Sequence, residues 1–104
     1  MKLTNAVEFY SCLDVIMNHY GRQHQIFEKL PEEAVELVEA YFHHSDHPSD
    51  VNWYHIIEEA ADVYVMLEQF QMLISPEEKK IFDKICMEKV RREVGRIEKA
   101  GGAK

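Results

Sequence analysis

Residues 32–40 read EEAVELVEA, and residues 58–66 read EEAADVYVM. In both stretches a Glu pair is followed by apolar residues at spacings of three and four, the period of an α-helix with one apolar face. In both, the second Glu is followed three residues later by another acid. The two stretches therefore predict a pair of amphipathic helices that carry the same arrangement of carboxylates.

Helix-breaking residues divide the chain into four helical segments. Gly21 ends the first segment, and Pro31 lies inside the second, where its missing amide hydrogen predicts a kink or a new helix start. Residues 75–78, SPEE, combine a cap, a proline at the first helical position and a capping-box Glu. The expected helices span residues 4–20, 23–44, 50–74 and 75–100, with Thr4 and either Ser49 or Asp50 as N-caps, and HHSDHPS at 43–49 as a loop.

No segment alternates with a period of two, so no strand is expected. The 104 residues are predicted to form one all-α domain, a four-helix bundle, with residues 100–104 as a flexible tail. The two central helices are expected to pack antiparallel through apolar stripes. The stripe of the helix at 23–44 consists of Leu30, Ala34, Leu37, Val38 and Tyr41. The stripe of the helix at 50–74 consists of Ile56, Ala60, Val63, Tyr64 and Leu67. The first helix has its own stripe, formed by Val7, Tyr10, Leu13 and Met17.

The charge is unevenly distributed along the chain. The net charge is −7, which argues against nucleic acid as a partner. No Lys or Arg occurs between Lys29 and Lys79, whereas residues 30–78 hold 12 Asp and Glu. Nine of the 12 Lys and Arg fall in residues 79–104. An acidic middle that binds cations and a basic end that binds anions is one interpretation, and mutual neutralisation of the two parts is the other.

Compartment and partners follow from what the sequence lacks. No apolar stretch reaches the length of a membrane span, and the acids near the N-terminus do not fit a secretory signal, so no membrane partner is expected. Cys12 and Cys86 lie far apart, and we expect reduced thiols with a packing role in a cytoplasmic protein. The segment 50–74 is apolar nearly all round, which predicts a homodimer or tetramer.

The repeated acids lie along matching flanks of the two stripes. Glu33 and Glu36 share one helix face, as do Glu59 and Asp62, because residues three apart are neighbours on a helix. Only Lys29 is placed one turn away to compensate them, and uncompensated like charges would raise their pKa values. Oxygen ligands suit Mg²⁺ or Mn²⁺. A cation site and a pair of solvated acidic faces both remain open on spacing alone.

These residues resemble the MazG-like, all-α nucleoside triphosphate pyrophosphatase superfamily. Glu32–Glu36 is similar to its EExxE motif and Glu59–Asp62 to its ExxD motif. An upstream Gln (Gln23 or Gln25), a Lys before the acids (Lys29) and a basic last helix are also typical of the family. The resemblance covers roughly residues 20–99 and is greatest to single-domain members from bacteria and phages.

The resemblance implies Mg²⁺-dependent hydrolysis of a nucleoside triphosphate to the monophosphate and pyrophosphate, with Mn²⁺ as a possible substitute. Glu33, Glu36, Glu59 and Asp62 would be the metal ligands, and Glu32 would serve a second ion. Water would attack the α-phosphorus, and a Glu, with Glu33 and Glu36 as the candidates, would accept its proton.

Substrate contacts are expected from several other positions. Lys89, Arg92 and Arg96 share one face of the last helix and would contact the triphosphate, unless they only balance neighbouring acids. His55, one turn before Glu59, would touch substrate or pair with that acid. Further candidates are Lys29 and Gln25 for substrate binding, and Tyr20, Trp53 and Tyr54 for stacking on a base, with packing as the alternative for these aromatic residues.

Three rival interpretations compete with this activity. A phosphoribosyl-ATP pyrophosphatase-like activity and a non-catalytic helical interaction module both remain open. A di-iron carboxylate bundle does not fit, because no acid in the chain is followed by His three residues later. The histidines near the end of the second segment favour a polar loop over a transition-metal site; they are His43, His44 and His47, beside Asp46.

Overall fold

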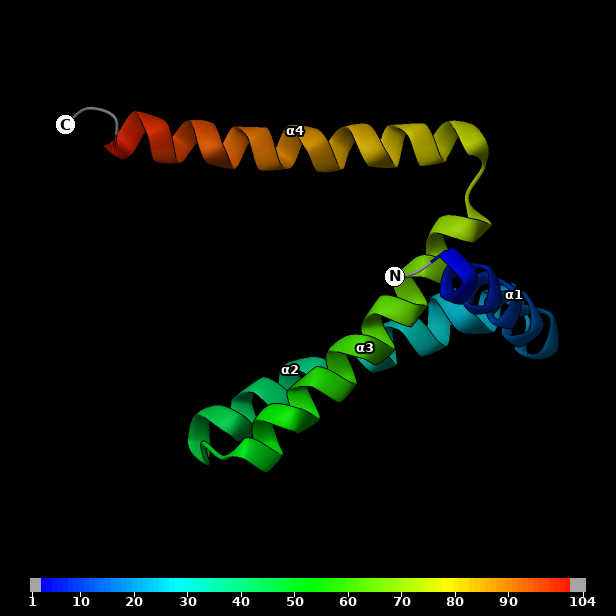
Figure 1. Cartoon of the computed structure of the whole chain (residues 1–104), viewed down its shortest axis with the longest axis horizontal. Coiled ribbons are helices and arrows are strands. Elements are labelled where there is room, and N and C mark those ends of the chain that lie inside the picture. Colours follow the sequence, from blue (N-terminus) through cyan, green and yellow to red (C-terminus); the bar gives the residue numbers. More distant parts are fainter. Residues whose placement is uncertain (1–2, 102–104) are drawn as a thin grey trace. The chain divides into compact units, whose positions relative to one another are not determined.

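The computed structural model describes residues 3–101, and its regular structure is helical throughout that range. The elements are α1 (Leu3–Tyr20), the π-helix η1 (His24–Lys29), α2 (Leu30–Asp46), α3 (Asp50–Leu73) and α4 (Pro76–Gly101) (Figure 1). No strand occurs between residues 3 and 101, so the predicted all-α class with four helices is confirmed. The chain divides into two units, one ending at Leu73 and the other beginning at Ile74. The predicted flexible tail lies, from residue 102 onward, outside the described residues.

Gly21 ends α1, as predicted. Its φ of 93° lies in the left-handed region that favours glycine, and its N–H donates to the carbonyl of Met17 at 2.9 Å. The start of α1 differs from the prediction. The helix already includes Leu3, so Thr4 lies inside it and is not its N-cap.

Replacing Gly21 with Ala is expected to destabilise the first unit by about 1–2 kcal/mol, because a Cβ is disfavoured in the left-handed region. No atom lies within 4 Å of the added Cβ, so backbone strain alone causes the loss. Urea unfolding followed by circular dichroism measures it. The matched control is Gly95→Ala, the same change at a helical position that is equally open, which is expected to add helix stability. Equal effects of the two changes would contradict the strain argument.

The π-helix η1 precedes Pro31, which lies in the first turn of α2. Proline lacks an amide donor, and its ring clashes with the carbonyl four residues before it, here Phe27. The wider π turn lies at this position, and the N–H of Leu30 donates to the carbonyl of Gln25. The predicted kink or new start at Pro31 is therefore confirmed as a change of helix type between Lys29 and Leu30.

A tight turn joins α2 to α3. The Oγ of Ser49 accepts from the N–H of Asn52 at 3.0 Å and so caps α3, as predicted. The Nδ2 of Asn52 donates to the carbonyl of His47 at 2.6 Å, which satisfies a group at the end of α2. The predicted loop from residue 43 to 49 is wrong at its start, because α2 continues to Asp46. Asn52 explains the difference, since its contact with His47 stabilises the longer helix end.

The helices α2 and α3 lie side by side (Figure 1), and the predicted stripes form the contact only in part, since Ile56 is buried whereas Leu30, Leu37 and Val63 are half-buried. The buried positions are Glu33 and Ala40 on α2, and Ile56, Met66 and Gln69 on α3. The stripe residues Ala34, Val38, Tyr41, Ala60, Tyr64 and Leu67 are exposed instead, with Val38 at 52% and Tyr41 at 51%. Each helix is apolar on two adjacent faces. The packed face is the one that includes Glu33 on α2 and Glu59 on α3.

The first helix contributes Leu13 and Met17 to the core, whereas Val7 of the same predicted stripe is exposed. Tyr10 of the same stripe lies at the edge of the core, and its hydroxyl donates to Oε2 of Glu68 at 2.8 Å. The predicted packing role of the cysteines is wrong. Cys12 and Cys86 are both free thiols with exposed side chains.

The second unit consists of the single long helix α4. Ser75 and Glu78 form the predicted capping box, with the N–H of Glu78 donating to Oγ of Ser75 at 3.1 Å and the N–H of Ser75 donating to Oε1 of Glu78 at 2.9 Å. The helix runs through Gly95 and includes Gly101, one residue beyond the predicted end. Among residues 3–101, no helix combines the length and the apolar composition that a bilayer span requires.

Candidate functional site

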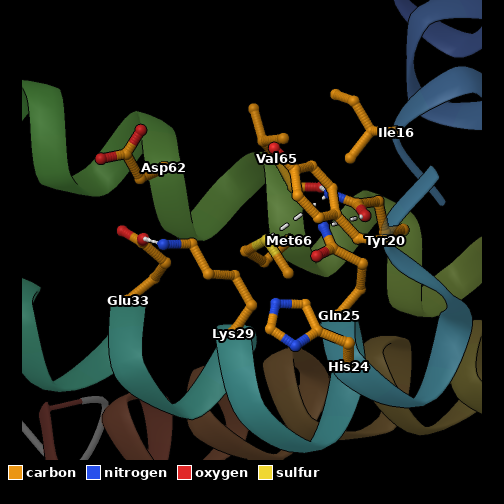
Figure 2. A pocket seen from close by; sticks show the side chains of 10 residues that line it. Ile16, Tyr20, His24, Gln25, Lys29, Glu33, Asp62, Val65 and Met66 are labelled. Atoms are coloured by element: carbon orange, nitrogen blue, oxygen red, sulfur yellow. Dashed lines mark hydrogen bonds and ion pairs between the residues drawn. The ribbon is translucent and has the colours of Figure 1, made fainter.

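Three carboxylates from two helices converge at the contact between α2 and α3. Glu33, Glu59 and Asp62 each offer an oxygen, and these three atoms lie within 4.8 Å of one another. Figure 2 shows Asp62 on α3 opposite Glu33 on α2. The acids of the two repeated stretches were predicted to converge. Three of the four do so in the fold, and Glu36 is the one that does not.

Two of these carboxylates are buried without full hydrogen bonding. Glu33 is only 6% exposed, and the side chain of Glu59 is 13% exposed. Within residues 3–101, Oε2 of Glu33 and Oε2 of Glu59 are buried and have no hydrogen-bond partner. An unpartnered buried carboxylate oxygen is costly, and a bound cation satisfies it. The oxygen-only donor set therefore fits a hard divalent cation such as Mg²⁺.

Lys29 partly neutralises the cluster. Its Nζ lies 3.0 Å from Oε1 of Glu33 and 3.8 Å from Oε1 of Glu32. The hydrogen bond to Glu33 and the charge of that residue raise the pKa of Lys29. With Glu33, Glu59 and Asp62 all ionised, one lysine against three carboxylates leaves a local charge of −2 (3 × −1 and +1), which equals the charge that a divalent cation would balance.

Repulsion within the cluster changes the acidity of two carboxyl groups. The charge of Glu33 raises the pKa of Glu36, and desolvation and Glu59 add to this effect. Asp62 is exposed, but desolvation by neighbouring atoms is still the largest cause of its raised pKa, followed by the charge of Glu33. Glu36 is therefore coupled to the cluster even though it is not one of the three converging carboxylates.

The metal-free protein is expected to lose stability as the pH rises from about 4 toward 7. The pKa values of Glu36 and Asp62 are raised in the fold, so their contribution is complete below the ordinary carboxyl pKa and is lost as the pH rises through the raised values. Urea unfolding in the presence of a chelator at several pH values measures this. The doubly substituted protein Glu36→Gln, Asp62→Asn should show a weaker pH dependence, and an unchanged slope would contradict the repulsion.

A pocket of about 460 Å³ adjoins the acid cluster, a volume typical of small-molecule sites. Glu33, Asp62 and Lys29 lie at one end of it (Figure 2). At the other end, α1 supplies Tyr20 and η1 supplies Gln25. The pocket is thus acidic and cationic at one end, and aromatic with amide groups at the other.

The other predicted site residues are placed as follows. Glu32 is exposed and forms an ion pair with Lys29, outside the converging carboxylates. His55 lies with Nε2 3.6 Å from Oε1 of Glu59, which matches the predicted pairing of these residues. Of the two candidate glutamines, Gln25 lines the pocket, and Gln23 is exposed outside it.

The basic face of α4 belongs to the second unit, so phosphate contact by Lys89, Arg92 and Arg96 stays a prediction. Arg96 pairs with Glu93 at 3.1 Å, which fits the alternative of local charge balance for that residue.

Of the candidate stacking residues, Tyr20 lines the pocket, whereas Trp53 and Tyr54 do not. The ring of Trp53 lies 5.7 Å from that of His44. The rings of His43 and His47 lie 5.7 Å apart, but within residues 3–101 no three potential ligands converge there. The predicted polar loop is corrected in part, since His43 and His44 lie in the last turn of α2 and His47 is its C-cap.

Sequence reasoning missed Gln69 and His24, which both line the pocket. Gln69 lies seven residues after Asp62, on the same helix face, and this spacing is a signal that could have linked it to the acids. His24 directly precedes Gln25, and only the π-helical geometry of η1 brings both residues to the pocket.

Comparison with protein-family models, with curated proteins and with solved structures yielded no match for this chain.

Proposed function

We propose that this chain is a Mg²⁺-dependent nucleotide pyrophosphohydrolase of the MazG-like type, which hydrolyses a nucleoside triphosphate to the monophosphate and pyrophosphate. The observation that carries the proposal is the pair of buried, unpartnered oxygens of Glu33 and Glu59, which converge with Asp62 beside a pocket of nucleotide size. The proposal also rests on the EExxE and ExxD motifs that supply these residues.

The chain's own residues divide the chemical work. Glu33, Glu59 and Asp62 would hold the cation, with Mn²⁺ as a substitute. Bound there, Mg²⁺ would neutralise phosphate charge and lower the pKa of the attacking water. Lys29 lines the same pocket and has three N–H donors. Glu33 accepts from one and Glu32 lies at ion-pair distance, so a donor remains to orient a phosphate oxygen.

Glu36 is the proposed proton acceptor. It lies close enough to Glu33 and Glu59 for their charges to raise its pKa in the metal-free protein, so it is placed to accept a proton beside the cation that they would hold. Glu36 is also half-buried beside the cluster rather than part of it, so its oxygens are not needed to hold the cation. This division differs from the family expectation, in which all four acids are metal ligands.

The test is an assay of pyrophosphate release by the full chain with Mg²⁺ and each of the common ribo- and deoxyribonucleoside triphosphates. Phosphoribosyl-ATP is included as the competing substrate. Turnover of at least one triphosphate that stops when the metal is chelated is the expected result. Absence of turnover for every substrate would favour the non-catalytic helical module, for which Asp62→Ala leaves function intact and raises thermal stability.

The expected homo-oligomer also remains a prediction. It is supported by the exposed apolar side chains on the outer faces of α2 and α3, among them Val38, Tyr41, Tyr64 and Leu67. Sedimentation equilibrium of the full chain measures it.

A further inference from the structure

The end of the pocket away from the acids contains a buried pair of amides from different elements. Nε2 of Gln25 on η1 donates to Oε1 of Gln69 on α3 at 2.8 Å. Gln25 is 4% exposed and Gln69 is 1% exposed, so both amides are removed from bulk solvent. Both nevertheless line the pocket. Buried amides are normally fully hydrogen-bonded, so the bonds that each group makes and lacks are informative.

The orientation of the pair is fixed by Gln69. Its Nε2 lies 3.4 Å from the carbonyl of Val65 and 3.5 Å from Sδ of Met66, both of which only accept hydrogen bonds. Oε1 of Gln69 must therefore face Gln25 and accept from it. Gln25 is left with one unused N–H and with Oε1, to which no group in residues 3–101 donates. It thus presents an acceptor beside a donor.

An acceptor beside a donor is the pattern that pairs with the edge of a nucleobase, as when Gln contacts adenine through two hydrogen bonds. The surroundings fit a flat ring. The rings of Tyr20 and His24 lie 5.9 Å apart at an interplanar angle of 30°, and both line the pocket beside Gln25. Aromatic faces stack on any base, so they supply affinity, whereas the amide edge supplies selectivity.

The distance along the helix also fits. Gln25, Lys29 and Glu33 follow one another at spacings of four residues, and all three line the pocket. Eight residues of α-helix correspond to roughly 12 Å along the axis, and the wider π turn of η1 makes this span somewhat shorter. This is the scale of a nucleoside with its first phosphate groups, so phosphate oxygens near Lys29 and the acids would leave the base at Gln25 (Figure 2).

We propose that Gln25 contacts the base of the nucleotide substrate and sets base preference, and that Gln69 positions it. The inference rests on the proposed function for the identity of the ligand as a nucleotide. It is independent of that function in one respect, since it requires base-dependent binding and not hydrolysis.

The experiment compares wild-type protein, Gln25→Ala and Gln69→Met on a panel of nucleoside triphosphates and on inorganic tripolyphosphate, which has no base. Gln25→Ala is expected to lower kcat/KM for the preferred nucleotide roughly tenfold or more, mainly through KM, and to flatten base preference. Tripolyphosphate hydrolysis should be unchanged. Gln69→Met should give the same pattern in weaker form. Gln23→Ala, at an exposed position outside the pocket, is the matched control.

A uniform loss on all substrates, tripolyphosphate included, would assign Gln25 a purely structural role and overturn the inference. Unchanged base preference in Gln25→Ala would overturn it as well, while leaving the proposed hydrolysis intact.

Calorimetric binding of α,β-methylene nucleoside triphosphates with Mg²⁺ covers the case in which wild-type protein shows no turnover. Base-dependent binding that Gln25→Ala abolishes would then support the base contact and reject only the hydrolysis. No nucleotide binding at all would reject both.

Discussion

Replacing Glu59 with Gln is expected to lower Mg²⁺-dependent pyrophosphate release by about 10³-fold. A bound cation contributes several kcal/mol to transition-state stabilisation, and about 4 kcal/mol corresponds to that factor. Gln keeps the shape of the side chain but removes the charge from an oxygen that is buried and unpartnered. Steady-state kinetics at saturating nucleotide and varied Mg²⁺ measure the loss, which should appear in kcat.

The stability of the same variant should move in the opposite direction. Removing one charge from a cluster of three carboxylates relieves repulsion, so the melting temperature of the metal-free variant should equal or exceed that of the wild-type protein. Glu39→Gln, at an exposed position of α2, is the control and should retain full activity. A Glu59→Gln protein that is less stable and still active would show that Glu59 is a structural residue and not a metal ligand.

Adding Mg²⁺ to the chelated protein is expected to raise the free energy of unfolding by about 2.7 kcal/mol once the cation reaches one hundred times its dissociation constant. For a domain of this size each kcal/mol corresponds to roughly 4–8 °C in Tm. The physical reason is that a ligand held by Glu33, Glu59 and Asp62 binds only the folded chain, since these residues come from two helices. Differential scanning calorimetry with and without Mg²⁺ measures the shift.

The Mg²⁺ effect should depend on the cluster. Glu33→Gln is expected to remove most of the stabilisation, whereas Glu39→Gln should keep it. An equal rise in Tm for wild-type protein and Glu33→Gln would indicate general screening of a chain with net charge −7 rather than a specific site.

The helices were predictable because their ends have local causes. The capping box from Ser75 to Glu78 and the left-handed Gly21 depend on residues within one turn, and both were found where the sequence placed them. The extension of α2 to Asp46 was not predictable from local signals. It depends on the side-chain amide of Asn52, which reaches back across the turn from the next helix.

The site was predictable in composition but not in orientation. The repeated acids indicated a carboxylate cluster, and three of them do converge. The sequence could not decide which apolar face of α2 meets α3, because Leu37 and Ala40 form one such face and Val38 and Tyr41 the next. Burial of Ala40 together with Glu33 settles this choice, and it places Glu33 inside the helix contact rather than on its flank. Gln69 was missed for the same reason, since it becomes a site residue only if the face of α3 that carries it packs towards α2.

The change of helix type at Lys29 determines how the side chains before and after it are oriented around the helix axis. Four residues turn an α-helix about 40° past one full revolution, whereas four residues of a π-helix, with its five-residue hydrogen bonds, fall short of one revolution. The step from Gln25 to Lys29 lies in η1 and turns the helix by less than one revolution. The step from Lys29 to Glu33 lies in α2 and turns it by more than one revolution, so the two deviations cancel and Gln25 and Glu33 point in nearly the same direction. Deleting one residue from η1 would rotate Gln25 out of line with Glu33 while leaving both side chains intact.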